Sequence, residues 1–199
     1  MPSLEDVQKA LLNMSGQGST DFDLNPDVQA LLPKGRKLRS AAVLVPLLQR
    51  EKGLNLILTK RASQMKHHPG QIAFPGGKVE AADKDNRTAA LRESAEEIGL
   101  PKDNVAVLCD LPPHETITGF QVTPVVGHVL QPFQYLPEAG EVDEVFEVPL
   151  AHVLNLKNFQ VQGRIFQGQM RYYYVVPYGP YYIWGATARM LRSFAEGMR

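Results

Sequence analysis

The sequence predicts an α/β domain in which a mixed β-sheet is sandwiched between helices. Apolar, strand-like segments occur before and after a long predicted helix over residues 88–98, and a further helix is expected near the C-terminus. Strands on either side of a helix favour a layered arrangement of sheet and helices. The chain has 199 residues, of which 44% are apolar, and this is enough for one domain with a sizeable core.

Five segments are expected to form the strands of this sheet. Leu54, Leu56 and Leu58 recur with a period of two, which indicates a strand over residues 54–59. Residues 51–53 join it to a preceding strand over residues 41–48. Further strands are expected at residues 105–109, 122–129 and 142–149. Pro46 and Pro124 fall inside two of these runs, and they indicate edge positions or bulges because proline cannot donate to a ladder.

Residues 1–39 are expected to form an N-terminal helical extension to a domain that spans residues 40–199. Ser3 is a suitable cap for a short amphipathic helix. Residues 16–20 have the composition of a flexible link. Asn25 and Pro26 then predict the start of a second short helix that runs through Leu32. Packing against the same domain is favoured over partner binding as the use of this segment.

Three carboxylates crowd one face of the helix over residues 88–98. Glu93, Glu96 and Glu97 are three and four residues apart, so all three project from the same side. Like charges at this spacing destabilise a helix by a few tenths of a kcal/mol per pair. A cluster of hard oxygen ligands is, however, what a divalent cation such as Mg²⁺ requires. Gly99 fits the position that ends the helix.

A Gly–Gly turn precedes the acidic helix. Gly76 and Gly77 follow Phe74 and Pro75, and a pair of glycines permits a tight turn and close approach of the backbone to a ligand. Glutamate-rich helix faces are most often solvated surface, and Arg92 and Glu96 have the spacing of an ordinary ion pair. The combination of the turn with the three carboxylates favours a metal site over that alternative.

This region resembles the signature of the Nudix hydrolases, which reads Gly, five residues, Glu, seven residues, Arg-Glu, an aliphatic residue, any residue, Glu-Glu, any residue, Gly and an aliphatic residue. Fourteen residues separate Gly77 from Arg92 where the signature has thirteen. Asp83 takes the place of the first Glu, and Ser94 occupies the aliphatic position. The residues that match the second half of the signature are Arg92, Glu93, Glu96, Glu97, Gly99 and Leu100.

The resemblance implies the Nudix α/β/α sandwich over roughly residues 40–190, and a metal-dependent hydrolysis of pyrophosphate bonds. Mg²⁺ or Mn²⁺ would neutralise the diphosphate oxygens and acidify a bound water. The implied metal ligands are Glu93, Glu96, Glu97 and the carbonyl of Gly77. Arg92 is expected to orient the glutamates, so Glu93, Glu97 and Arg92 are the expected catalytic residues, joined by Glu141.

A basic loop lies upstream of the Gly–Gly turn. Arg61, Lys66, His67 and His68 suit a polyanionic ligand. The stretch over residues 56–77 resembles the extra motif of the coenzyme A diphosphatase branch of the Nudix family, in which Arg61, Ala62, Gly70 and Phe74 to Gly77 match and Lys66 replaces an arginine. The expected substrate-binding residues of this loop are Arg61, Lys66, Gly70 and Phe74, with Arg61 and Lys66 holding the 3′-phosphate. A phosphate-proximal or solvated position is favoured over a metal pair for the two histidines.

Two later segments add candidates. Residues 111–127 resemble another stretch of the same branch, and Thr118 and Phe120 are expected to line the pocket. Glu141 is the first candidate for a further carboxylate, with Glu144 second. The aromatic tract over residues 170–185 is compatible either with adenine stacking or with core packing. Thr187 is expected to cap the final helix.

The expected function is hydrolysis of coenzyme A or acyl-coenzyme A to adenosine 3′,5′-bisphosphate and 4′-phosphopantetheine or its acyl form. The alternatives are a Nudix diphosphatase acting on NADH, a nucleoside triphosphate, ADP-ribose or capped RNA, and a non-catalytic nucleotide-binding sensor. Acidic and basic residues number 21 each, which argues against binding of long nucleic acid. No apolar run is long enough to span a membrane. The single Cys109 fits a reducing compartment and a cytoplasmic location, and the oligomeric state, including a homodimer, is left open.

Overall fold

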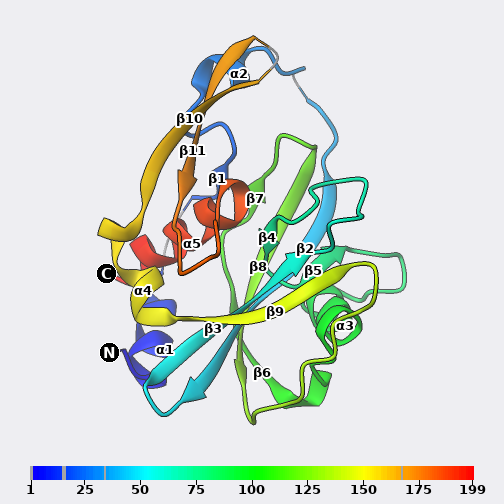
Figure 1. Ribbon diagram of the computed structural model, residues 1–199, viewed down its shortest axis with the longest axis vertical. Helices are drawn as coiled ribbons and strands as arrows, with labels where there is room; N and C mark the ends of the chain where they lie inside the picture. The colour runs from blue at the N-terminus through cyan, green and yellow to red at the C-terminus, as the bar shows by residue number, and fades with distance from the viewer. Residues whose placement is uncertain (1, 15–16, 34, 167) are drawn as a thin grey trace.

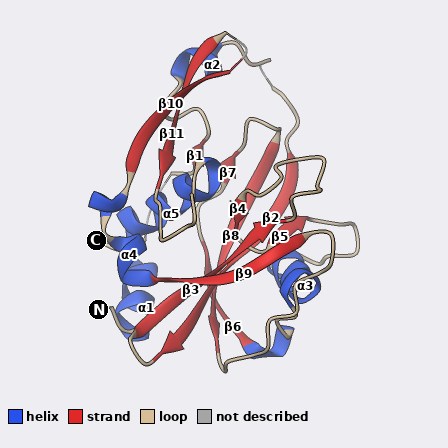
Figure 2. Ribbon diagram, viewed as in Figure 1, coloured by secondary structure: helices blue, strands red, loops and turns tan. Residues whose placement is uncertain are grey.

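The computed structural model describes residues 2–14, 17–33, 35–166 and 168–199 (Figure 1). It confirms the α/β class with a mixed sheet and covering helices (Figure 2). The helices are α1 (Leu4–Asn13), α2 (Pro26–Ala30), α3 (Asn86–Ile98), α4 (Leu150–Leu154) and α5 (Gly185–Gly197). The strands are β1 (Ser19–Thr20), β2 (Arg39–Arg50), β3 (Gly53–Arg61), β4 (Ile72–Ala73), β5 (Gly76–Lys78), β6 (Val105–Asp110), β7 (His114–Glu115), β8 (Phe120–Val129), β9 (Val142–Pro149), β10 (Gln160–Phe166) and β11 (Gln169–Val175).

The main sheet follows the order β1-β7-β8-β2-β3-β4, with β5 paired to β2, β6 to β8 and β9 to β3. The central pair, β2 and β8, is parallel from Arg39 opposite Phe120 to Leu48 opposite Val129. Most other pairs are antiparallel. A separate hairpin of β10 and β11 projects from the body at the end where α2 lies (Figure 1).

Side chains that alternate along β2 and β3 form two cores on opposite faces of the sheet. Leu47 and Leu56 belong to one core together with side chains of α1, α4 and α5. Leu44 and Ile57 belong to the other, which α3 covers. The period of two noted in the sequence therefore separates the faces as expected, and α3 stands alone on the face that carries the acidic cluster. None of the helices in the described ranges has the length and apolar character needed to span a bilayer.

The prediction that Pro46 and Pro124 mark edges or bulges is wrong. Both lie in interior strands, and each lies where the pairing on one side of its strand is interrupted. On the side of β2 away from β8, β5 pairs with residues up to Val43 and β3 pairs from Leu47 onward, so Pro46 faces a gap. Pro124 lies likewise between the segments of β8 that pair with β7 and with β6. The missing N–H of proline is tolerated there because no partner strand requires it.

The N-terminal segment is tied to the main sheet. Ser3 caps α1 as predicted, in a reciprocal capping box with Asp6. The predicted flexible link over residues 16–20 is wrong for Ser19 and Thr20, which form β1 and pair in parallel with β7; residue 16 lies outside the described residues. Asn25 precedes α2, but its side chain hydrogen-bonds the backbone of Tyr172 in both directions at 2.8 Å instead of capping.

Candidate active site

Helix α3 is held against β5 and β2 by defined ends. The Asp85 carboxylate accepts from the N–H of Thr88 at 2.8 Å and caps the N-terminus. Gly99 ends the helix in the left-handed conformation, at φ 71°, as predicted. Ser94, at the position where the signature has an aliphatic residue, is buried and donates its hydroxyl to the Ala90 carbonyl at 2.7 Å. The helix thus presents its three glutamates at increasing exposure, from Glu97 through Glu93 to Glu96.

Glu97 is the buried member of the cluster, with 5% of the residue exposed. One carboxylate oxygen accepts from the N–H of Gly76 at 3.0 Å. Burial raises the pKa of Glu97 to about 7, and the charges of Glu93 and Glu141 add to the effect. Gly76 has φ 152°, and a Cβ there would lie 2.5 Å from the Ala42 carbonyl oxygen, so glycine is required for this turn to deliver its N–H to Glu97.

Gly77 lets the backbone of β5 approach Glu93. A Cβ at Gly77 would lie 2.5 Å from the carboxyl carbon of Glu93, which is inside van der Waals contact. Burial raises the pKa of Glu93, and the hydrogen bond from Arg92 only partly offsets this. Gly76 and Gly77, which the sequence predicted to form a tight turn, instead begin β5 and pair with β2. The close approach of the glycine backbone to a glutamate of α3 is nevertheless present at Gly77.

Arg92 orders the outer part of the cluster. It binds Asp83 with two parallel hydrogen bonds, from Nε at 3.0 Å and from Nη2 at 2.9 Å. Its Nη1 donates to Glu93 and to Glu96, both at 3.0 Å. The hydrogen bonds from Arg92 lower the pKa of Asp83 to about 2. Asp83 therefore fixes the arginine, and the arginine fixes one oxygen of each of two glutamates.

Two groups from other elements face Glu97. Glu141 lies in the turn before β9, and its carbonyl accepts from the N–H of Ala62 at 2.8 Å. Its charge raises the pKa of both Glu93 and Glu97. Arg61, at the end of β3, supplies the opposite sign and lowers the pKa of Glu97. The Arg61 Nε is buried and has no hydrogen-bond partner among the described residues.

The glutamates suit a divalent cation, although they are not closed around one. Within the described ranges, no three His, Cys, Asp or Glu side chains lie close enough together to enclose an ion. Arg92 and the Gly76 N–H hold one oxygen each of Glu93, Glu96 and Glu97. Burial and the charges of neighbouring carboxylates raise the pKa values of Glu93 and Glu97, and this effect outweighs the opposing contributions of Arg92 and Arg61. Clustered carboxylate oxygens beside the backbone of β5 suit Mg²⁺ or Mn²⁺.

The predicted substrate-binding residues are divided among different places. Arg61 lies by the glutamates, and Gly70 is in the left-handed conformation at φ 68°, where its N–H donates to the Arg61 carbonyl at 3.1 Å. Lys66 is exposed on the same loop. Phe74 is buried in the core. Phe120 lies beneath the guanidinium of Arg39, whose carbon is 3.9 Å from the ring centroid.

Thr118 lines a cavity of about 430 Å³ between the β10–β11 hairpin, β4 and the start of α5. His68 of the basic loop lines it as well, whereas His67 does not; both histidines are exposed. Tyr173 and Trp184 in its wall belong to the aromatic tract for which the sequence left adenine stacking open. Three other side chains in the wall were not candidates from the sequence: Arg164, Phe166 and Arg171. The two arginines become neighbours only through the register of the hairpin.

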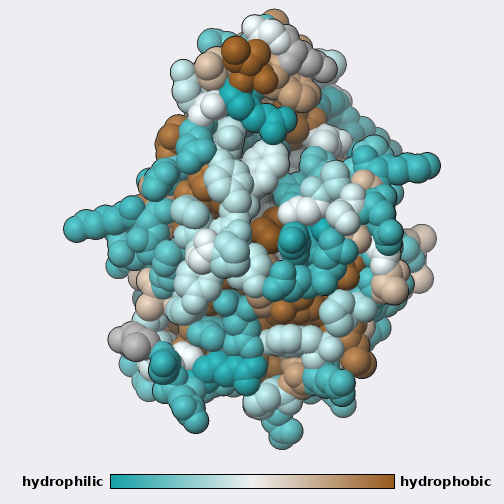
Figure 3. Space-filling model, in the orientation of Figure 1, coloured by the Kyte–Doolittle hydropathy of each residue, from teal (hydrophilic) through white to brown (hydrophobic). Residues whose placement is uncertain are grey.

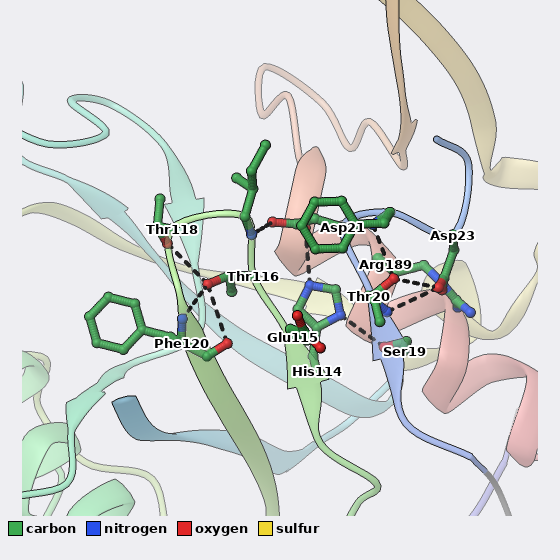
Figure 4. A network of polar contacts seen from close by, with 12 residues as sticks. Ser19, Thr20, Asp21, Asp23, His114, Glu115, Thr116, Thr118, Phe120 and Arg189 are labelled. Carbon is green, nitrogen blue, oxygen red and sulfur yellow. Dashed lines mark hydrogen bonds and ion pairs between the residues drawn. The ribbon is translucent and has the colours of Figure 1, made fainter. Parts of the chain in front are cut away.

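A buried histidine, which the sequence did not single out, supports the turn that carries Thr118 (Figure 4). His114 Nδ1 lies 2.9 Å from the hydroxyl of Ser19, and its Nε2 lies 3.0 Å from Asp21. Asp21 also accepts from the N–H of Ile117 at 2.8 Å. The N-terminal strand β1 is thereby fastened to the turn at residues 116–118, which forms one wall of the cavity.

The final helix, α5, forms another part of the cavity wall and is joined to β4. The prediction that Thr187 caps α5 is wrong, because the helix begins at Gly185 after Trp184. Thr187 lies in the first turn, is buried, and donates its hydroxyl to the Ile72 carbonyl at 3.0 Å. This bond joins α5 to β4, the strand that leads into the Gly–Gly turn.

Comparison with known proteins gives one consistent family. The model of the NUDIX domain matches residues 37–168. The Nudix hydrolase NudL of Enterobacter sp. (strain 638), itself described as uncharacterized, is 44% identical over 157 residues, which cover 79% of this chain and 81% of the relative. NudL of Cronobacter sakazakii is 43% identical over the same length. Among solved structures, the Nudix hydrolase RenU of M. smegmatis has a TM-score of 0.50 at 24% identity, covering 59% of this chain and 74% of RenU.

Proposed function

The chain belongs to the Nudix hydrolases, enzymes that act on pyrophosphate bonds of small nucleotides and generally use divalent metal ions, and we propose that its substrate is coenzyme A or an acyl derivative. The observation that carries this choice is Arg61. This residue begins the basic loop and matches the coenzyme A diphosphatase motif in register. Its buried Nε has no hydrogen-bond partner within the described ranges, and its charge acts on Glu97. A polyanionic substrate supplies the missing partner.

The residues of the cluster have separate roles in this proposal. Glu93, Glu96, Glu97 and the carbonyl of Gly77 would hold the cation, which supplies charge neutralisation and an acidified water when bound. Arg92 and Asp83 keep Glu93 and Glu96 oriented. Glu141 and the remaining oxygens of the glutamates are the candidates to position or deprotonate the attacking water.

The reaction breaks one P–O bond of the diphosphate. Water adds to one phosphorus, and the bridging oxygen leaves with the other phosphate. The products are adenosine 3′,5′-bisphosphate and 4′-phosphopantetheine, or its acyl form. Arg61 lies next to Glu97, so its assignment to the diphosphate is favoured over the 3′-phosphate that the sequence alone suggested for it. Lys66 is exposed on the loop and is proposed to accompany the entering phosphates.

A product assay tests the proposal. The enzyme is incubated with Mg²⁺ or Mn²⁺ and with equal concentrations of coenzyme A, NADH, ADP-ribose or dGTP, and the products are separated by chromatography. We expect adenosine 3′,5′-bisphosphate from coenzyme A at the highest kcat/KM of the four. Preferential cleavage of one of the others would replace the substrate assignment with a different Nudix diphosphatase activity. Binding of these nucleotides without turnover would favour a sensor.

We propose a cytoplasmic location because the chain has a single cysteine, Cys109, which fits a reducing compartment. Cys109 is half-buried in β6, and burial raises the pKa of its thiol, which disfavours the reactive thiolate.

A further inference from the structure

Two arginines face each other on the β10–β11 hairpin. Arg164 and Arg171 are directly opposite in the ladder. Like charges at directly opposite positions destabilise a hairpin. No carboxylate among the described residues forms an ion pair with either arginine. As with the glutamates of α3, like charges are held close together, but here the charges are positive.

Both arginines line the cavity of about 430 Å³ that Thr118 and His68 also line. The Nε of Arg171 is buried there without a hydrogen-bond partner in the described part of the chain. The one carboxylate in the cavity wall, Asp21, is engaged by His114 and by the Ile117 N–H. Figure 3 shows this side of the molecule, mostly hydrophilic, with apolar atoms in a recess where β4 lies in Figure 1. In the described part of the wall, the two arginines therefore outnumber the single carboxylate, and neither forms an ion pair with it.

Aromatic rings complete the wall beside the arginines. The guanidinium carbon of Arg164 is 5.5 Å from the centre of the Trp184 ring. Tyr173 meets Trp184 edge to face, with ring centroids 5.3 Å apart. Phe166 and Tyr172 lie in the same wall and are exposed. Flat aromatic surfaces next to arginine forks match a ligand that joins a base to a phosphate.

The cavity adjoins the catalytic cluster. Ala73 lies in its wall, and Gly76, whose N–H binds Glu97, follows three residues later. Three residues of chain span at most about 10 Å. Arg61 lies near both the glutamates and the cavity, because its charge lowers the pKa of Glu97 and also the pKa of His68. For His68 the larger cause of the lowered pKa is burial. One extended nucleotide can therefore place its diphosphate at the glutamates and its nucleoside in the cavity.

We propose that this cavity binds the 3′-phosphoadenosine end of coenzyme A, with Arg171 and Arg164 on the 3′-phosphate and Trp184 against the base. The inference rests on the proposed function for the identity of the substrate. It explains why the hairpin retains a repelling pair of arginines, and it makes the hairpin the specificity element of the enzyme. The pantetheine arm then leaves the diphosphate on the side away from the cavity.

Trp184 is the single tryptophan of the chain, so its fluorescence reports binding without catalysis. Adenosine 3′,5′-bisphosphate and adenosine 5′-monophosphate are titrated into the enzyme in the presence of a chelator. We expect the bisphosphate to change the emission and to bind more tightly than the monophosphate. Arg171→Ala should weaken bisphosphate binding roughly 10- to 150-fold, the range for a lost charge-assisted hydrogen bond, and should leave monophosphate binding nearly unchanged.

Arg87→Ala is the matched control, since Arg87 is an exposed arginine that pairs with Asp110 away from the cavity; its bisphosphate affinity should equal that of the wild type. Arg171→Ala should unfold at the same temperature or a higher one, because a like-charge pair is removed. Arg164→Ala provides a second variant with the same expectation.

Unchanged Trp184 emission with the bisphosphate, or equal affinities in the wild type and both cavity variants, would overturn the inference. If coenzyme A is cleaved under that outcome, the proposed function stands and only the cavity assignment fails. If the bisphosphate binds through Arg171 while coenzyme A is not cleaved, the cavity assignment stands and the proposed substrate is wrong.

Discussion

Glu147 lies in strand β9 of the sheet and Glu97 lies in helix α3, which packs on that sheet, and their pKa values move in opposite directions. At Glu147 burial would raise the pKa, but hydrogen bonds from Arg50, Tyr135 and Asn55 outweigh it and lower the pKa to about 2. Arg50 Nε and Asn55 Nδ2 reach the carboxylate at 3.0 and 2.8 Å. At Glu97 a single N–H from Gly76 opposes burial, and the pKa rises to about 7.

The difference separates a carboxylate that the fold satisfies from one that we propose to be functional. Glu147 joins β2, β3 and β9 and has its charge matched inside the fold, so it stabilises the native state. Glu97 has Glu93 and Glu141 for neighbours, and the Gly76 N–H and the charge of Arg61 do not offset burial and this repulsion. A buried group that the fold leaves unsatisfied lowers stability, and this is the pattern expected at a site that serves catalysis. Arg164 and Arg171 of the hairpin are likewise charged groups that have no ion-pair partner among the described residues.

The largest expected effect is on turnover. Glu97→Gln should lower kcat by about 10³ or more, because a ligand carboxylate that balances transition-state charge contributes several kcal/mol. The unfolding temperature should stay the same or rise, since a repelling charge is removed. Steady-state kinetics at saturating Mg²⁺ and thermal unfolding are the two measurements. Wild-type kcat in this variant would remove α3 from the mechanism.

Substrate discrimination should be the next largest effect. Coenzyme A should exceed dephospho-coenzyme A by roughly 10- to 150-fold in kcat/KM, the effect of a lost charge-assisted contact. Arg171→Ala should shrink this ratio, whereas Arg61→Ala should lower both values alike because both substrates contain the diphosphate. Equal kcat/KM for the two substrates in the wild type would show that the 3′-phosphate is not read.

Glu147→Gln should have the reverse profile of Glu97→Gln. Arg50 loses its counter-charge, and the free energy of unfolding should fall by about 2 kcal/mol, as for a hydrogen bond to a charged group. For a domain of this size that lowers the unfolding temperature by roughly 4–8 °C. The kcat should remain within a few-fold of the wild type. A large loss of kcat without loss of stability would place Glu147 in the catalytic machinery and break the distinction.

The smallest expected effect is the pH dependence of the contribution that Glu147 makes to the free energy of unfolding. The pKa of Glu147 is lowered from 4.5 to about 2 on folding, so its stabilising effect is present above pH 4.5 and is lost as the pH falls toward about 2. The difference in unfolding free energy between the wild type and Glu147→Gln should be constant from pH 7 to about 5 and should shrink below that. Urea unfolding at a series of pH values measures it. A difference that grows on acidification would contradict the assignment.

Local patterns explain how much of this molecule the sequence predicted. Periodicity and end signals are local features, since they involve residues only a few positions apart. They predict the helix over residues 88–98, its end at Gly99 and the main strands. The clustering of the glutamates was visible for the same reason, since helix spacing alone brings Glu93 and Glu97 together. The sequence did not show that Glu97 is buried or that the backbone at Gly77 lies against Glu93.

What the sequence did not reveal depends on pairings between distant segments. β1 has two residues and no periodic pattern, and it forms only because β7 lies beside it, with His114 reaching Ser19 and Asp21. Pro46 and Pro124 look like edge residues until the interrupted ladders are known. Arg164 and Arg171 are unremarkable in the sequence and become a pair through the hairpin register.

Titration of Mn²⁺ into the wild type, Glu97→Gln and Glu147→Gln, followed by the paramagnetic signal of the free ion, distinguishes the two kinds of carboxylate. The carboxylates of α3 should hold a divalent cation, whereas Glu147, which is paired with Arg50, should not. We expect the wild type and Glu147→Gln to bind Mn²⁺ with equal affinity and Glu97→Gln to bind at least about tenfold more weakly, the loss expected when a carboxylate ligand is removed. Equal Mn²⁺ affinity in all three proteins would contradict the account.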